Sequence, residues 1–191
     1  DPYRLGLTDA AVLDAIGNPA GLRVLDLGAG EGYMARRLAG MGARVTGVDI
    51  NPGMIAAAIE TEDREPLGIT YRVGSAYELP FRAASFDLVV TNHLASDLDD
   101  LDQAAREIAR VLTPNGRWVS LQLHPMYGVR QDQPGWHRDY FRLRAREHFF
   151  VVSGLRSPVP VTRHDRSLTD ILGAEDAFGA IAQRAIKRKT G

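Results

Sequence analysis

Residues 23–33 have the sequence RVLDLGAGEGY, and this stretch decides the fold class. Its first five residues form a short run of leucine and a β-branched residue that stops at a glycine, as a buried strand does. Met34, Leu38 and Met41 follow at the spacing of an apolar helix face. The stretch therefore predicts a strand, a glycine-rich loop and a helix, in that order.

The same alternation of strand and helix continues on both sides of this unit. A leading helix is expected from about Thr8 to Gly17, with Thr8 as its N-cap. The predicted strands are residues 23–27, 44–48, 69–73, 86–91 and 117–123. Between the last two, one face of an amphipathic helix is marked by Leu101, Ala105, Ile108 and Leu112, and a turn at 113–116 ends it. The pattern predicts an α/β fold with a doubly wound, mostly parallel sheet.

Composition limits the classes of protein to which the chain can belong. The chain has 191 residues, of which 45% are hydrophobic and 25% charged, so one packed domain is expected over 1–191. A net charge of −1 makes nucleic acid an unlikely partner. No apolar run is long enough for a membrane span, and the lack of cysteine agrees with a reducing, cytoplasmic location. The numbering starts at Asp1, so a leading segment would not be visible.

The chain changes character after the fifth predicted strand. Aromatic residues and seven arginines are interspersed in residues 125–165, which predicts a small lid or substrate-covering insertion. Within it, residues 149–153 and 159–163 are expected to pair as a hairpin. The domain then divides into a cofactor-binding core (1–124), this lid and a C-terminal helix and strand (166–191). The arginines have an alternative interpretation as a solvated face.

The glycine-rich loop predicts a nucleotide-type ligand. Asp26 stands near the strand end, and Gly28, Gly30 and Gly32 follow at alternate positions before the helix. Glycines let the backbone approach a ligand closely, and a helix N-terminus offers free N–H groups. The dinucleotide fingerprint G-x-G-x-x-G needs glycine where this chain has Tyr33, which argues against NAD. The alternative is a glycine-rich connection without a ligand.

The second predicted strand ends at an acid, Asp49, which lies 21 residues after Gly28. An acid at about this interval accepts hydrogen bonds from the ribose hydroxyls of a bound nucleotide. The competing interpretation makes Asp49 the cap of the helix that begins at 51–52, because Asp is a favoured N-cap residue.

The spacing Asp-x-Gly-x-Gly-x-Gly at 26–32 resembles motif I of class I S-adenosylmethionine-dependent methyltransferases. Residues 73–81 (VGSAYELPF) are similar to the adenine-binding stretch G-D-A-x-x-L-P-F, with Ser75 in place of the acid; a turn role for Ser75 is the alternative. Residues 85–93 are similar to motif IV, and 106–116 resemble the helix and turn that follow it. Segments 123–125 and 166–168 resemble the flanks of the lid in small-molecule methyltransferases, whereas the usual C-terminal signals of the family are missing.

The resemblance implies a Rossmann-like methyltransferase fold and S-adenosyl-L-methionine as cofactor. The residues that it implies for cofactor binding are Asp26, Gly28, Ala29, Gly30, Gly32, Asp49, Ile50, Met54, Ser75, Ala76 and Asn92. The expected reaction is methyl transfer to a small-molecule acceptor. Because the sulfonium is already activated, positioning and water exclusion are the main tasks, and no metal is expected.

Two histidines follow strands at their carboxyl ends and are candidate catalytic residues. His93 and His124 are each placed to remove a proton or to orient the acceptor, since an imidazole ordinarily titrates near neutral pH. The alternative is a structural role, which for His124 is anchoring the lid. Two other functions stay open, namely a cofactor-binding protein that transfers no methyl group and an RNA methyltransferase with a basic segment at 184–189. No oligomeric state is predicted.

Overall fold

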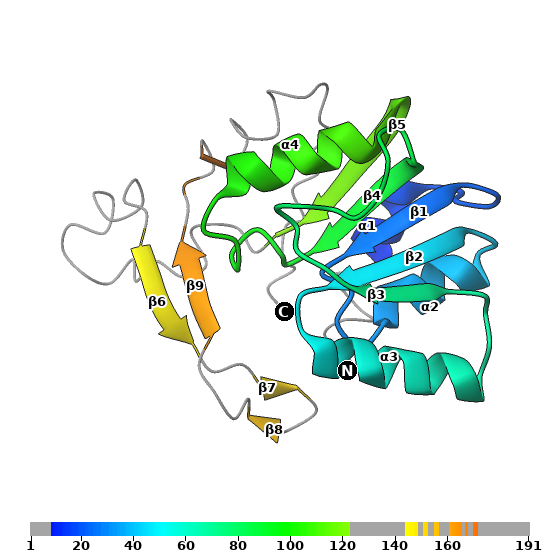
Figure 1. The fold of residues 1–191 in the computed structure, drawn as a ribbon, viewed down its shortest axis with the longest axis horizontal. Coiled ribbons are helices and arrows are strands. Elements are labelled where there is room, and N and C mark those ends of the chain that lie inside the picture. Colours follow the sequence, from blue (N-terminus) through cyan, green and yellow to red (C-terminus); the bar gives the residue numbers. More distant parts are fainter. Residues whose placement is uncertain are drawn as a thin grey trace, which may run out of the picture.

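A five-stranded parallel sheet forms the centre of the molecule (Figure 1). The computed structural model describes residues 9–122, 144–148, 151–152, 155–156, 161–165, 167 and 170–171. The strands of the sheet are β1 (Arg23–Leu27), β2 (Arg44–Asp49), β3 (Thr70–Val73), β4 (Phe86–Asn92) and β5 (Leu112–Leu121). The helices are α1 (Asp9–Ile16), α2 (Tyr33–Gly40), α3 (Pro52–Arg64) and α4 (Leu101–Val111). The strand order is β3-β2-β1-β4-β5, so the predicted doubly wound parallel sheet is confirmed.

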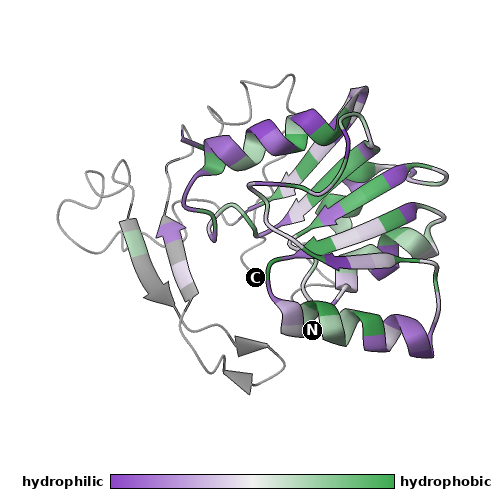
Figure 2. Ribbon diagram, in the orientation of Figure 1, coloured by the Kyte–Doolittle hydropathy of each residue, from purple (hydrophilic) through white to green (hydrophobic). Residues whose placement is uncertain are grey.

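Successive side chains of the central strands enter different cores, because side chains alternate between the two faces of a sheet. Val24 of β1 and Leu88 of β4 pack with residues of α1, α2 and α3. Leu25 of β1 and Val89 of β4 pack with residues of α4. Bands of polar and hydrophobic residues along α4 agree with one buried face (Figure 2). Helices therefore cover both faces, as expected of buried parallel strands.

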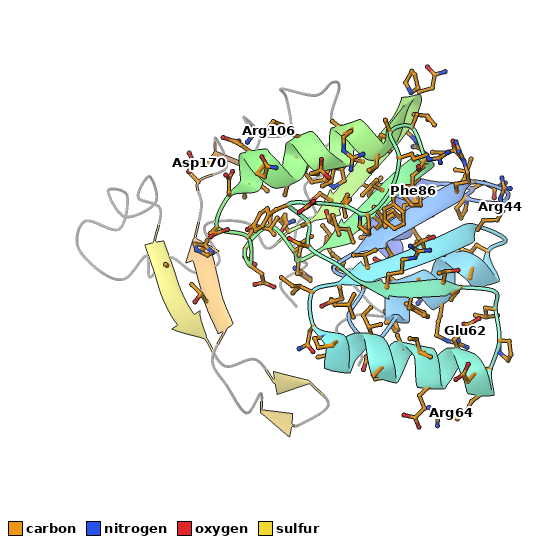
Figure 3. The ribbon with its side chains drawn as sticks, viewed as in Figure 1. Arg44, Glu62, Arg64, Phe86, Arg106 and Asp170 are labelled. Atoms are coloured by element: carbon orange, nitrogen blue, oxygen red, sulfur yellow. The ribbon has the colours of Figure 1, made fainter. Side chains whose placement is uncertain are left out.

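The entry into β3 is held by Glu62, which projects from α3 (Figure 3). Its Oε1 accepts hydrogen bonds from three consecutive backbone N–H groups, those of residues 67, 68 and 69, at 2.6, 2.7 and 3.1 Å. Its Oε2 lies 3.1 Å from Nη1 of Arg36 on α2. A single partly buried carboxylate thus joins two helices to the turn that starts the edge strand.

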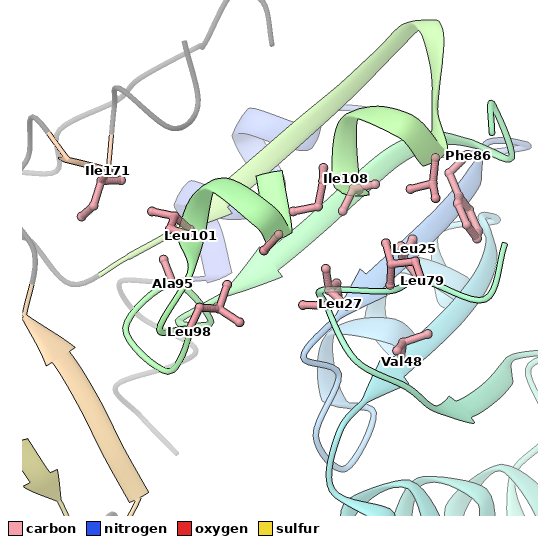
Figure 4. Close-up of a cluster of buried hydrophobic side chains, with 14 residues drawn as sticks. Leu25, Leu27, Val48, Leu79, Phe86, Ala95, Leu98, Leu101, Ile108 and Ile171 are labelled. Atoms are coloured by element: carbon pink, nitrogen blue, oxygen red, sulfur yellow. The ribbon is translucent and has the colours of Figure 1, made fainter. Parts of the chain in front are cut away.

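The core under α4 extends beyond the sheet (Figure 4). Leu101 and Ile108 of α4 are buried in it. Ile171 belongs to the same cluster, although it lies far along the chain. Ser167 and Asp170 exchange side-chain-to-backbone hydrogen bonds at 3.0 and 3.1 Å, a reciprocal pattern typical of a helix start. Of the predicted C-terminal helix and strand, only these first residues lie in the described part.

The boundary between α4 and β5 differs from the sequence-based expectation. β5 begins at Leu112 and not at 117, because Leu112 pairs with Phe86 before the register jumps to Leu88 opposite Arg117. The residues at 113–116 form an irregularity within the strand and not a turn between two elements. Leu112 therefore lies outside α4, and the fully buried Val111 is the last residue of its apolar face.

The predicted pairing of residues 149–153 with 159–163 is wrong. β7 (Val151–Val152) pairs instead with β8 (Leu155–Arg156), and β6 (Arg144–His148) pairs with β9 (Val161–Asp165), both antiparallel. Because Val152 already pairs with Leu155, the later strand can only pair with residues before this short hairpin. The backbone N–H of His164 on β9 donates to the carbonyl oxygen of Ser96 at 2.6 Å, which ties β9 to the loop after β4.

Candidate functional site

The strand register brings the predicted site residues to one edge of the sheet. Leu27 at the end of β1 pairs with Val48 of β2 and with Thr91 of β4. The residues that follow these three, Gly28, Asp49 and Asn92, therefore share one level at the carboxyl ends. The strand order reverses around β1, and ligands of open α/β sheets bind outside the carboxyl ends at such a point.

The glycine loop crosses from β1 onto the end of β2. The N–H groups of Gly28 and Ala29 donate to the carbonyl oxygen of Val48 at 2.8 and 3.0 Å. Gly28, Gly30 and Gly32 have φ values of +77°, +55° and +86°, a region that side chains rarely adopt. A Cβ at Gly30 would meet nothing within 4 Å, so this side of the loop is open.

Gly32 has a different reason to be glycine. A Cβ there would collide with the ring and hydroxyl of the buried Tyr71, which lies beneath the loop. A Cβ at Gly28 would come within 3.1 Å of Leu94. Within the described part of the chain, Gly30 is therefore the one of the three glycines with no neighbouring atom on its Cβ side.

Asp26 lies behind the glycine loop and not on its outer surface. Its relative exposure is 1%. Burial raises its pKa to about 7, opposed by a hydrogen bond from the backbone N–H of Ala35 and assisted by the charge of Asp49. Ala35 stands in the first turn of α2, whose N-cap Gly32 has no side chain to satisfy the free N–H groups. Asp26 therefore supports the helix start, and its Oδ2 has no hydrogen-bond partner among the described residues.

Asp49 binds the glycine loop directly. Its Oδ2 accepts a hydrogen bond from the N–H of Gly30 at 2.8 Å, and its Oδ1 accepts one from the N–H of Asn51 at 2.8 Å. The N-cap of α3 is Asn51, whose side chain accepts from the N–H groups of Gly53 and Met54 at 2.9 and 3.3 Å. The interpretation of Asp49 as the helix cap is therefore wrong. Each carboxylate oxygen keeps capacity for a further hydrogen bond.

Two further predicted cofactor residues, Ile50 and Ser75, lie near Asp49 in the chain or through its hydrogen bond with Gly74. Ile50 is 71% exposed, the largest exposed fraction of a large apolar side chain among the described residues. The N–H of Gly74 donates to the carbonyl oxygen of Asp49 at 3.0 Å and so places the next segment against β2. There, Ser75 Oγ accepts from the N–H of Tyr77 at 3.1 Å, as the turn interpretation expects, and retains its own proton for donation. Met54 is partly buried and Ala76 buried.

The end of β4 carries a strained histidine. His93 has a φ of +63°, and its N–H donates to the carbonyl oxygen of Leu121 at 2.8 Å. Positive φ is uncommon for residues other than glycine and clusters at functional sites. The preceding Asn92 has a buried Oδ1 without a hydrogen-bond partner among the described residues. His124 lies outside the described residues.

Sequence reasoning missed one polar cluster next to the loop. Tyr33 and Arg37, one helical turn apart on α2, both bind Oδ2 of the buried Asp9 on α1, at 2.5 and 2.7 Å. The hydrogen bond with Tyr33, followed by the charge of Asp9, raises the pKa of Arg37 against the cost of burial. Their spacing of four residues was the only signal in the sequence. The residue that replaces the third glycine of the dinucleotide fingerprint thus joins α2 to α1.

Neither a metal cluster nor a membrane helix occurs in the described part of the chain. No group of three or more His, Cys, Asp or Glu side chains in these ranges could hold a metal ion. No helix among the described residues is long and apolar enough to cross a membrane.

A methyltransferase family model and several proteins named as methyltransferases match this chain. A family model described as a methyltransferase domain matches residues 25–120. The ubiquinone biosynthesis O-methyltransferase of Azorhizobium caulinodans is 33% identical over 123 residues, which are 61% of this chain and 49% of that protein. The demethylmenaquinone methyltransferase of Tropheryma whipplei is 36% identical over 116 residues, which are 60% of this chain and 48% of that protein. The chain thus spans about half the length of these relatives.

A solved structure extends the similarity over most of the chain. The S-adenosylmethionine-dependent methyltransferase of Mesorhizobium loti superposes with a TM-score of 0.70 at 25% identity. The superposition covers 91% of this chain and 81% of that one.

Proposed function

Because this chain belongs to the methyltransferase domain family, whose model matches residues 25–120, we propose that it transfers a methyl group to a small-molecule acceptor. S-adenosyl-L-methionine is the cofactor that the family and the fold imply. The observation that carries the proposal is the 2.8 Å hydrogen bond between Asp49 and the N–H of Gly30. It joins the two motifs that hold such a cofactor into one preformed edge.

The residues at this edge fit the three parts of S-adenosylmethionine. The open side of Gly30 and the unsatisfied Asn92 Oδ1 suit its amino-acid end. The remaining acceptor capacity of Asp49 suits the ribose diol. Other residues suit the adenine. Ile50 suits its face, because covering an exposed apolar side chain with an aromatic ring buries apolar surface, which favours binding.

Ser75 and Ala76 suit the adenine edge, with Met54 beside them. Gly28, Ala29, Gly32 and Asp26 hold the loop itself.

The bound cofactor supplies an activated methyl group, and the chain supplies the position of the acceptor. An in-line approach of two oriented groups is itself a large catalytic effect. His93 is the described residue best placed to orient the acceptor or remove its proton, because it follows Asn92 at the same edge. His124 shares this proposed role. Anchoring is the alternative for both.

The acceptor is a small molecule, and quinone-type compounds are the first class to test. The relatives are named for ubiquinone biosynthesis and for demethylmenaquinone. We propose residues 125–165 as the cover of the acceptor site. The hydrogen bond from His164 to Ser96 supports this, because it brings β9 to the loop that follows β4. Loops at the carboxyl ends of the strands are where substrates bind in such sheets.

Calorimetry with S-adenosylmethionine, S-adenosylhomocysteine and NAD tests the cofactor. Binding of the first two and not of NAD is expected, and the reverse would reject the proposal. Incubation with labelled cofactor and demethylmenaquinone then tests transfer. Tight cofactor binding without transfer to any acceptor would favour a non-methylating protein. A gel shift with RNA at moderate salt would favour an RNA methyltransferase.

A further inference from the structure

One polar side of α4 holds the loop that carries Ser75 and Ala76. Gln103, Glu107 and Arg110 stand at i, i+4 and i+7 and therefore share one side of the helix. All three hydrogen-bond to the backbone of the loop. Gln103 Nε2 donates to Tyr77 O at 3.1 Å, Leu79 N donates to Glu107 Oε2 at 2.7 Å, and Arg110 donates to Leu79 O at 2.9 Å and to Phe81 O at 2.8 Å.

Glu107 and Arg110 also bind each other, with Nε of Arg110 2.7 Å from Oε1 of Glu107. The side chain of Glu107 is 15% exposed. The hydrogen bond with Arg110 lowers the pKa of Glu107 against the cost of burial, and the N–H of Leu79 lowers it further. The pair is therefore charged at neutral pH. A guanidinium shared between a carboxylate and two carbonyl oxygens holds the loop in one geometry.

The opposite end of the loop is bound to the end of β2. The N–H of Gly74 donates to the carbonyl oxygen of Asp49 at 3.0 Å. Ala76 and Leu79 are buried in the same hydrophobic cluster as Ile108 of α4. Ser75 thus lies between one anchor on β2 and a second on α4, so we expect a change at the α4 anchor to move it relative to Asp49.

We propose that Gln103, Glu107 and Arg110 are positioning residues for adenine recognition. They act through the loop, by holding Ser75 and Ala76 in a fixed position relative to Asp49 at the end of β2, and they set the preference of the site for the adenine amino edge. This inference rests on the proposed function, because it requires an adenosyl ligand. Helix α4 would then contribute to the selectivity of the cofactor site.

The test compares two ligands that differ only at the base. Calorimetry gives the dissociation constants of S-adenosylhomocysteine and S-inosylhomocysteine, in which a carbonyl group replaces the adenine amino group. The wild-type protein is expected to prefer the adenosyl compound. Arg110→Ala and Glu107→Ala are expected to reduce this preference by about tenfold, the scale of one lost hydrogen-bond contact. Glu107→Gln, which retains an acceptor for the N–H of Leu79, is expected to restore part of it.

A control separates positioning from general loss of stability. Asp87→Asn breaks the ion pair with Arg23, which lies at the amino ends of β1 and β4 and away from the loop. It is expected to lower the melting temperature and leave the ligand preference unchanged. If the α4 variants weaken the binding of both ligands by the same factor, the ligand preference is unchanged and the positioning role is rejected. If the wild-type protein binds neither ligand, the proposed function fails, and this inference fails with it.

Discussion

The carboxylate of Asp49 accepts a hydrogen bond from the N–H of Gly30 at 2.8 Å, so the end of β2 and the glycine loop after β1 are one unit. Gly30 has a φ of +55° and an open Cβ side, and the hydrogen bond fixes this conformation. A loop that is already ordered loses less conformational entropy when a ligand binds. We therefore expect Asp49 to affect cofactor affinity in two ways, by the proposed contact with the ribose and by ordering the loop.

Replacement of Asp49 by alanine removes both effects. We expect Asp49→Ala to weaken S-adenosylhomocysteine binding by about tenfold or more, the equivalent of one charge-assisted hydrogen bond. Calorimetry measures the affinity. Asn51→Ala is the control, because it removes the N-cap of α3 and lowers stability by about 1 kcal/mol. Equal losses of affinity in the two variants would assign Asp49 to local stability alone.

The open side of Gly30 makes a second prediction. Gly30→Ala adds a Cβ at positive φ, which costs about 1–2 kcal/mol of stability, and it points the methyl group into the space assigned to the cofactor. Gly21→Ala is a matched control, since Gly21 also has a positive φ, +76°, with nothing within 4 Å of its Cβ position. We expect similar melting temperatures for the two variants and loss of cofactor binding only in Gly30→Ala. Retained binding in both would place the ligand elsewhere.

The site could be predicted from the sequence as far as single motifs allow. The spacing of Gly28, Gly30 and Asp49 was sufficient to place them at one edge, because parallel strands of similar length end together. The bond between Asp49 and Gly30 could not be predicted, since it depends on how far the loop leans over β2. The sequence also could not choose between Asp49 and Asn51 as the cap of α3, because both side chains are favoured caps. In the structure Asn51 is the cap.

The fold was predictable where periodicity was strong and local. Helix α4 shows its buried face in the sequence, and only its end was misplaced, because Leu112 pairs with Phe86 across the sheet. The pairing of β6 with β9 and of β7 with β8 was mispredicted for a related reason. Several registers satisfy its alternating pattern, and a period of two residues does not choose among them.

The Glu62 carboxylate predicts a dependence of stability on pH. Burial tends to raise its pKa, but the three backbone N–H groups and Arg36 outweigh this, so the pKa lies below its usual value of 4.5. Its contribution to stability is therefore full above the unfolded-state pKa and is lost as the pH falls through the lower folded-state pKa. We expect Glu62→Ala to cost roughly 2–4 kcal/mol at neutral pH.

Urea unfolding between about pH 3 and pH 7 measures this contribution. The difference between wild-type protein and Glu62→Ala should shrink as the pH falls. Glu60→Ala serves as control, because Glu60 is exposed on the same helix. A difference that does not depend on pH would mean that packing, and not the carboxylate charge, accounts for the loss.

The last prediction concerns the histidine at the end of β4. His93 has a φ of +63°, and asparagine is one of the few other side chains that tolerate this conformation. His93→Asn therefore keeps the backbone and removes the imidazole. If His93 removes a proton from the acceptor, the rate of single-turnover methyl transfer should fall 10²–10⁴-fold, the usual contribution of a general base, and lose its rise near neutral pH. The affinity for S-adenosylhomocysteine should remain unchanged, because the imidazole is not assigned to the cofactor. His124→Asn is measured in parallel, since it shares the proposed role. A rate that falls only in His124→Asn would transfer the role to that residue, and wild-type rates in both would mean that transfer proceeds by proximity alone.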